Sequence, residues 1–164
     1  MIDIARMAVA SARRWRVLVS SGKLARVDTH LHHRYRIAQG QVYEVFRDTV
    51  GDDGLGGARC VLVVAFRLRL IASFPPAHWL FQRVCLLTTP FWSGFVGFRE
   101  KLWMVDPETK SYLGIYDWAG AENARIYVEM LVRVLRPIST TDSVWYEIVP
   151  SQDFEAYLAA RAVG

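Results

Sequence analysis

The segment "GFREKLWMVDPETKSYLGIYDWAGAENARIYVEML", residues 97–131, decides the predicted fold. Residues 97–105 and 111–118 are rich in apolar and aromatic residues, and the turn sequence DPETK between them predicts a hairpin. A helix over 121–135 follows, because apolar residues recur there at helical spacing until Pro137 ends the pattern. The segment therefore predicts two antiparallel strands followed by an amphipathic helix.

Four further elements surround this segment. We expect strands over 61–70 and 143–149, a helix over 75–87 that opens with prolines, and a short closing helix over 153–162. The resulting order, β-α-β-β-α-β, is the split unit of the ferredoxin-like fold. We therefore predict an α+β, ferredoxin-like domain over residues 59–164.

Residues 1–58 are predicted to form an extension of this domain. It comprises a basic amphipathic helix over 2–19, a histidine-rich connector, two short strands around Gln39-Gly40 and a glycine-rich linker over 51–58. The helix is expected to dock onto the core or onto a partner subunit. The alternative is peripheral contact of residues 1–19 with an anionic membrane surface.

Charge and composition narrow the class of protein. Residues 1–38 carry eight basic and two acidic side chains, whereas the whole chain has a net charge of only +4, and no nucleic-acid-binding motif accompanies them. We therefore expect no nucleic-acid partner. Hydrophobic residues make up 52% of the chain, which suggests a buried cavity or a subunit interface.

Membrane insertion and disulfide bonding are not expected. The longest charge-free run, Val84–Phe98, contains Pro90 and is shorter than the roughly 20 apolar residues that a spanning helix needs. Cys60 and Cys85 lack CxxC spacing and read as buried free thiols in a reducing cytosol. The expected location is cytoplasmic, with a membrane-peripheral location as the alternative.

The hairpin and its helix resemble the dimeric α/β-barrel superfamily, in particular antibiotic-biosynthesis-monooxygenase and YdhR-like proteins. The shared features are a glycine-led strand, an aromatic strand that ends in tryptophan, and a helix that begins with small and acidic residues. They are supplied here by Gly97, Trp118, Ala121, Glu122 and Tyr127. The resemblance covers about residues 60–150 and implies a homodimer, in which two sheets enclose a ligand cavity.

The alternation of side chains along the 111–118 strand also predicts that both faces of the sheet are buried. Alternation places Tyr112, Tyr116 and Trp118 on one side of the 111–118 strand, and Leu113 and Ile115 on the other. Neither set is polar enough to face water. Helices cover one face of such a sheet, so we expect a second subunit to cover the other.

The 111–118 strand supplies the first candidate site. Gly114 leaves room between Tyr112 and Tyr116, which suits a flat ligand, and Tyr112 is a candidate substrate-binding residue. The resemblance implies that Trp118 lines the active site, with Tyr116 as a candidate proton donor. The alternative is that this aromatic stripe is ordinary core.

Three cationic or titratable residues are further candidates. Alternation directs Arg67 and Arg69 toward the cavity, where they could hold an acidic or enolate-like oxygen, although ion pairs with carboxylates would also explain them. His78, near the start of the 75–87 helix, is a candidate general base, with a surface histidine as the alternative.

Seven aromatic residues in the segment 74–98 predict a hydrophobic lid over a greasy substrate, with dimer packing as an equal alternative. Trp92 and Phe95 of this segment, and Trp103 of the next strand, are predicted to bind substrate.

The stretch "VDTHLHHR", residues 27–34, looks like the first metal-binding strand of an amidohydrolase, but that chemistry needs a (β/α)₈ barrel of typically about 250 residues. His30, His32 and His33 could bind adventitious zinc or nickel, and we predict no catalytic metal.

No cofactor is expected either. Haem-degrading members of the resembling superfamily use an asparagine on the first strand, at the position where we expect Phe66 in this chain. They also use a histidine around the second helix, and this chain has none between Ala119 and Val144.

The hydrophobic composition and the aromatic strands favour a protein with an apolar cavity that acts on a small hydrophobic or aromatic metabolite. The resemblance implies, as the leading hypothesis, a cofactor-independent monooxygenase of secondary metabolism that acts on an apolar or aromatic, polyketide-like substrate. A cyclase or isomerase that uses the same cavity is the first alternative. A non-catalytic ligand-binding or membrane-peripheral protein is the second.

Overall fold

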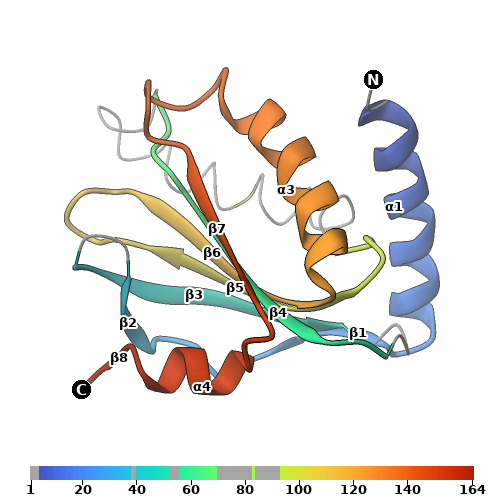
Figure 1. The fold of residues 1–164 in the computed structure, drawn as a ribbon, viewed down its shortest axis with the longest axis horizontal. Helices are drawn as coiled ribbons and strands as arrows, with labels where there is room; N and C mark the ends of the chain where they lie inside the picture. The colour runs from blue at the N-terminus through green and yellow to red at the C-terminus, as the bar shows by residue number, and fades with distance from the viewer. Residues whose placement is uncertain (1–3, 38–39, 52–55, 70–82, 84–92) are drawn as a thin grey trace.

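The computed structural model of the chain describes residues 4–37, 40–51, 56–69, 83 and 93–164 (Figure 1). The described helices are α1 (Ile4–Ser20), α3 (Ala121–Leu135) and α4 (Phe154–Ala159). The strands are β1 (Leu24–Val27), β2 (Arg34–Ile37), β3 (Gln41–Gly51), β4 (Arg59–Phe66), β5 (Phe98–Val105), β6 (Tyr112–Ala119), β7 (Trp145–Pro150) and β8 (Ala162–Val163).

All the strands belong to one antiparallel sheet. Its order is β7-β4-β6-β5-β3-β2-β8, and β1 pairs with β3 beside this path. The four strands of the predicted ferredoxin-like unit are neighbours, in the order β7-β4-β6-β5. Strand β3 continues the sheet at the β5 edge, so residues 1–58 and 59–164 share a single sheet.

The predicted hairpin and helix are confirmed. Strands β5 and β6 pair from Phe98↔Trp118 to Val105↔Tyr112, and α3 has the predicted bounds. Strand β4 ends at Phe66 instead of residue 70, because the backbone carbonyl of Arg67 turns away to accept a hydrogen bond from the Thr140 amide at 2.7 Å. The predicted helix over 75–87 and most of the predicted lid lie outside the described residues.

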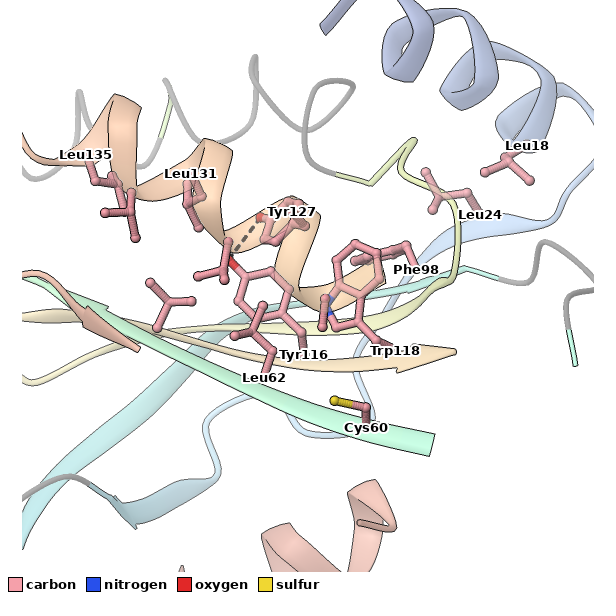
Figure 2. Close-up of a cluster of buried hydrophobic side chains, with 14 residues drawn as sticks. Leu18, Leu24, Cys60, Leu62, Phe98, Tyr116, Trp118, Tyr127, Leu131 and Leu135 are labelled. Atoms are coloured by element: carbon pink, nitrogen blue, oxygen red, sulfur yellow. Dashed lines mark hydrogen bonds between the residues drawn. The ribbon is translucent and has the colours of Figure 1, made fainter. Parts of the chain in front are cut away.

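Helix α3 covers one face of the sheet. Its buried side chains, among them Tyr127, Val128 and Leu131, pack on Leu62 of β4 and Trp118 of β6 (Figure 2). Each buried apolar side chain contributes about 1.5–3 kcal/mol through its removal from water. We call this the α3 face of the sheet.

The opposite face is covered within the same chain. Val61, Leu102 and Ile115 are fully buried there, in a cluster that also contains Tyr35 of β2 and Phe154 of α4. The sequence led us to expect a second subunit on this face. The sheet instead curls, so that β2 and α4 enclose it. We call it the α4 face.

Helix α1 lies beside α3 and docks onto the core of its own chain. Leu18 near its end is 7% exposed and joins the α3-face cluster, and Trp15 packs against the same cluster. Val9 and Val17, on its outer side, are exposed. Among the described helices, none combines the length and the apolar character that crossing a bilayer requires.

The cover of the α4 face can be tested with Phe154→Ala. Phe154 is 1% exposed, so removing its ring leaves a cavity between α4 and the sheet. We expect the free energy of unfolding to fall by about 3–5 kcal/mol, measured by urea denaturation.

Tyr146→Ala provides the matched aromatic control, because Tyr146 on β7 is 45% exposed. It should cost less than about 1 kcal/mol. Equal losses in the two variants would contradict the proposed role of α4.

Candidate functional site

Three aromatic side chains meet between β6 and α3. Tyr116 and Trp118 rise from β6 toward α3, and Tyr127 descends from α3 to meet them (Figure 2). The hydroxyl of Tyr127 donates a hydrogen bond to the hydroxyl of Tyr116 at 3.1 Å, and the Tyr127 and Trp118 ring centroids are 4.9 Å apart. We call these three residues the aromatic cluster.

Gly114 has a different role from the one its position in the sequence suggested. A Cβ atom added there would lie 2.8 Å from the ring of Tyr116. The space above Gly114 is therefore filled by the Tyr116 ring, not left open for a flat ligand between Tyr112 and Tyr116. The absence of a side chain at Gly114 leaves room for that ring to lean over this position.

Two cationic side chains lie beside the aromatic cluster. Lys101 of β5 pairs with Tyr116, and its ammonium group is 3.0 Å from the ring centroid of Trp103 and 4.7 Å from that of Tyr116. The guanidinium of Arg47 on β3 is 6.0 Å from the Trp103 centroid. Lys101 is only 4% exposed, and contact with aromatic faces partly offsets the loss of hydration of its ammonium group.

Several buried donors on the same face have no acceptor within the described part of the chain. They are the indole N–H groups of Trp103 and Trp118 and the hydroxyl of Thr49, which pairs with Lys101 across β3 and β5. Nearly all buried polar groups in proteins are hydrogen-bonded. A face that combines these donors with a buried ammonium is suited to an oxygen atom, anionic or carbonyl, on an otherwise apolar ligand.

Sequence reasoning missed Lys101 and Arg47. A lysine or arginine in a strand normally reads as a solvent-exposed residue. The available signal was their position: Lys101 lies two residues from Trp103 and so shares its face of the strand. Only the pairing of β3 with β5 reveals that Arg47 joins them.

Other predicted aromatic residues divide between two places. Phe95 is half-buried, stands edge-on to Tyr127 at 5.2 Å, and lines a pocket of about 510 Å³ between α1 and α3. Tyr112 is at the other end of β6, where it stacks on Phe66 at 5.8 Å. The predicted residues His78 and Trp92 lie outside the described residues.

Arg67 and Arg69 lie past the end of β4. The exposed Arg67 has its backbone amide bonded to the Ser143 hydroxyl at 3.2 Å, and the Nε of Arg69 donates to the Ser139 carbonyl at 3.3 Å. Trp118 pairs with Cys60, and seven strand residues from Cys60 to Arg67 correspond to roughly 23 Å. The structure does not bring these arginines to the aromatic cluster.

The three histidines within the described residues separate into one buried and two exposed residues. His30 is 6% exposed; its Nδ1 is 3.1 Å from Asp48 Oδ2 and 3.3 Å from Glu100 Oε1, and its Nε2 is 3.5 Å from Glu155 Oε2. Hydrogen bonds to Asp48 and Glu100 raise the pKa of His30 to about 10. His32 and His33 are exposed.

Burial also affects the pKa of two other groups. It raises the pKa of the Glu100 carboxyl, and it raises the pKa of the Cys60 thiol. Cys60 is a free and buried thiol, as predicted, and a raised pKa makes it a poor nucleophile.

Solved structures with a similar fold exist at low sequence identity. A heme-degrading enzyme from Listeria monocytogenes aligns with a TM-score of 0.51 and 12% identity, over 85% of this chain and 94% of that enzyme. A ferredoxin fold protein related to antibiotic biosynthesis monooxygenases, from Listeria monocytogenes 4b F2365, aligns with a TM-score of 0.44 and 16% identity, over 72% and 69% of the two chains. A monooxygenase-like protein from Listeria innocua gives 0.44 and 15%, over 72% and 68%.

These similarities concern the fold. The alignment with the heme-degrading enzyme, together with the sheet order β7-β4-β6-β5 and the packing of α3 on one face, supports the predicted ferredoxin-like α+β fold. Neither a protein-family model nor a curated protein sequence matches the chain.

The buried histidine predicts how stability depends on pH. Folded His30 holds its proton up to about pH 10, whereas an unfolded imidazole releases it near pH 6.5. The stabilisation is thus complete below pH 6.5 and is lost as the pH rises toward 10. We expect the free energy of unfolding, measured by urea denaturation in EDTA buffer, to fall between pH 6.5 and 9.

His30→Gln should flatten this dependence, because it removes the titrating group. His32→Gln should retain it, since His32 is exposed. A slope that survives in His30→Gln would refute the assignment.

Proposed function

We propose that the chain is a monooxygenase-like enzyme for a small apolar or aromatic substrate that carries an acidic hydroxyl group. The proposed site is the α3 face of β5 and β6. One observation carries the proposal: Lys101 is buried between the rings of Trp103 and Tyr116, on a face whose buried indole and hydroxyl donors find no acceptor among the described residues. The fold alone does not determine an activity.

Lys101 would stabilise the substrate as a phenolate or enolate. An ammonium group held in a dry, apolar setting interacts with an anion far more strongly than it does in water. The indole N–H groups of Trp103 and Trp118 can donate to the same oxygen or to a second one. The rings around them would bury the flat body of the substrate.

The hydroxyl groups of Tyr116 and Tyr127 would act together in proton transfer to the substrate. The Tyr116 hydroxyl, which accepts a hydrogen bond from the Tyr127 hydroxyl, would donate its own hydrogen to a substrate oxygen. Proton transfer by a positioned side chain typically contributes 10²–10⁴-fold to a rate. Tyr116 thus keeps the role of proton donor that the sequence suggested.

The oxidation needs only dioxygen as co-substrate. Deprotonation of a substrate methylene, with the proton passing to water, gives the enolate that Lys101 would stabilise, and the enolate carbon adds dioxygen. The resulting peroxide anion would take up a proton from the Tyr116 hydroxyl to give a hydroperoxide. Loss of water from R₂CH–OOH leaves a ketone, so that R₂CH₂ + O₂ gives R₂C=O + H₂O. No external reductant is required, and polyketide-like phenols of secondary metabolism have the necessary acidity.

We do not propose haem degradation as the function of this chain. Helix α3, which spans the second-helix position of the fold, contains no histidine that could bind haem iron. The same anion could also serve a cyclase or isomerase, and oxygen consumption separates that reaction from a monooxygenase.

Lys101→Met tests the proposed role of the ammonium group. With a hydroxylated anthrone as the probe substrate, we expect kcat/KM for oxygen uptake to fall about 10²–10³-fold, the usual cost of removing one oxyanion stabiliser. Tyr116→Phe should lower kcat more than it changes KM. An oxygen electrode measures the uptake, and mass spectrometry identifies the ketone.

Tyr43→Phe is the matched control, because Tyr43 is a buried tyrosine of the α4-face cluster whose hydroxyl donates to Gln41 at 2.8 Å. It should leave turnover unchanged. Equal rates for wild type and Lys101→Met would reject the proposed site, and turnover without oxygen uptake would reassign the enzyme as a cyclase or isomerase.

A further inference from the structure

Four segments that are distant in the sequence converge on the side chain of His30. His30 lies in the connector between β1 and β2, Asp48 on β3, Glu100 on β5 and Glu155 in the first turn of α4. Figure 1 shows α4 beside this connector, on the α4 face of the sheet. This group belongs to neither the aromatic cluster nor the surface around Lys101.

The charges in this group do not balance. Three carboxylates surround a single imidazole, which carries at most one positive charge. Every lysine and arginine of the chain lies within the described residues, yet among these residues Asp48, Glu100 and Glu155 form their ion pairs with His30 alone. The site therefore has an excess of negative charge, and a buried excess of this kind favours a bound cation.

A carboxylate oxygen of Asp48 provides independent support for a bound cation. Asp48 is fully buried, and its Oδ1 atom has no hydrogen-bond partner among the described residues. A buried carboxylate oxygen normally accepts at least one hydrogen bond. A water molecule held by a cation would supply the missing donor.

We propose that His30, Glu100 and Glu155 bind a divalent cation of the zinc class. One ligand atom from each of these residues lies within 4.8 Å of the others. Ligands at about 2.0–2.2 Å from zinc are roughly 3.5 Å apart, so closure requires movements of about 1 Å. Glu155 can make such a movement, because its side chain is 64% exposed.

Asp48 orients the imidazole for this role. Its Oδ2 atom is 3.1 Å from Nδ1 of His30, the arrangement in which a carboxylate fixes the tautomer of a metal-binding histidine. The Nε2 atom, which faces Glu155 at 3.5 Å, is then the metal ligand. The Oε1 atom of Glu100 is 3.3 Å from Nδ1, so Glu100 would turn its carboxylate from Nδ1 toward the ion. An imidazole among the ligands favours zinc, cobalt or nickel over magnesium or calcium.

The bound cation would join the connector of residues 28–33 to α4. Such a bond holds the N-terminal strands and the C-terminal helix together across the α4 face. The role that follows is structural, and it does not depend on the chemistry proposed for the α3 face.

Cobalt(II) titration of the whole chain tests the site. We expect one equivalent to bind in 0.15 M salt with a dissociation constant in the micromolar range, giving visible ligand-field absorption that zinc abolishes. Glu155→Gln should weaken binding at least about 10-fold, because it replaces a ligand carboxylate. Its partly exposed position allows the variant to fold, which urea denaturation verifies. Zinc should raise the Tm of the wild type, and this shift should disappear in Glu155→Gln.

Glu44→Gln is the matched control. It removes the carboxylate that lies 3.4 Å from the exposed His32, and binding should persist in this variant. Absence of saturable binding below 1 mM would overturn the proposal and leave protonated His30 as the only counter-ion. Binding that is lost in Glu44→Gln and kept in Glu155→Gln would assign the metal to the surface histidines instead, and would also overturn it.

Discussion

The structure depends on the burial of both faces of its central strands. Leu62 and Val63, neighbours on β4, point to opposite faces, and both are fully buried. A sheet with two apolar faces cannot remain in water on either side, and helices α3 and α4 provide the two covers. The curl that brings β2 over the α4 face follows from the same requirement. Burying a polar group without a hydrogen bond costs free energy of folding. The few polar groups that are buried beneath α3 and α4 are therefore candidates for a functional role.

The two candidate sites lie back to back on one strand. Glu100 and Lys101 are adjacent on β5, and strand alternation sends the first toward the α4 face and the second toward the α3 face. One face therefore holds an excess of negative charge around His30, and the other holds a cation among aromatic rings. A register shift of one residue would exchange the two side chains, so that Glu100 would leave the group around His30 and Lys101 would leave the aromatic rings. The hydrogen-bond register of β5 thus fixes both sites together.

The sequence patterns correctly predicted the helices and strands that are specified by residues close together in the chain. The hairpin around DPETK and the helix that ends before Pro137 are specified by local turn chemistry and by helical periodicity. Local sequence patterns could not predict how the α4 face is covered. Strand β3 pairs with β5 across about 50 residues, and a local pattern does not indicate which distant strand is the partner. Most residues of the two candidate sites could not be predicted from the sequence for the same reason. Trp118 and Tyr116 follow from the β6 pattern, whereas Lys101 gains its significance from contacts across strands, and the carboxylates around His30 are scattered along the whole chain.

The pairing of β2 with β8 has a consequence for how the protein is made. Arg34 pairs with Val163, so about 130 further residues must leave the ribosome after Arg34 before this edge of the sheet can close. Until then, Tyr35 and Ile37 lack the neighbours that bury them in the finished protein. Contacts of such long sequence separation form slowly, and the waiting strands expose apolar surface that nascent chains can use to aggregate. Chaperone demand during translation should therefore be concentrated on the N-terminal strands.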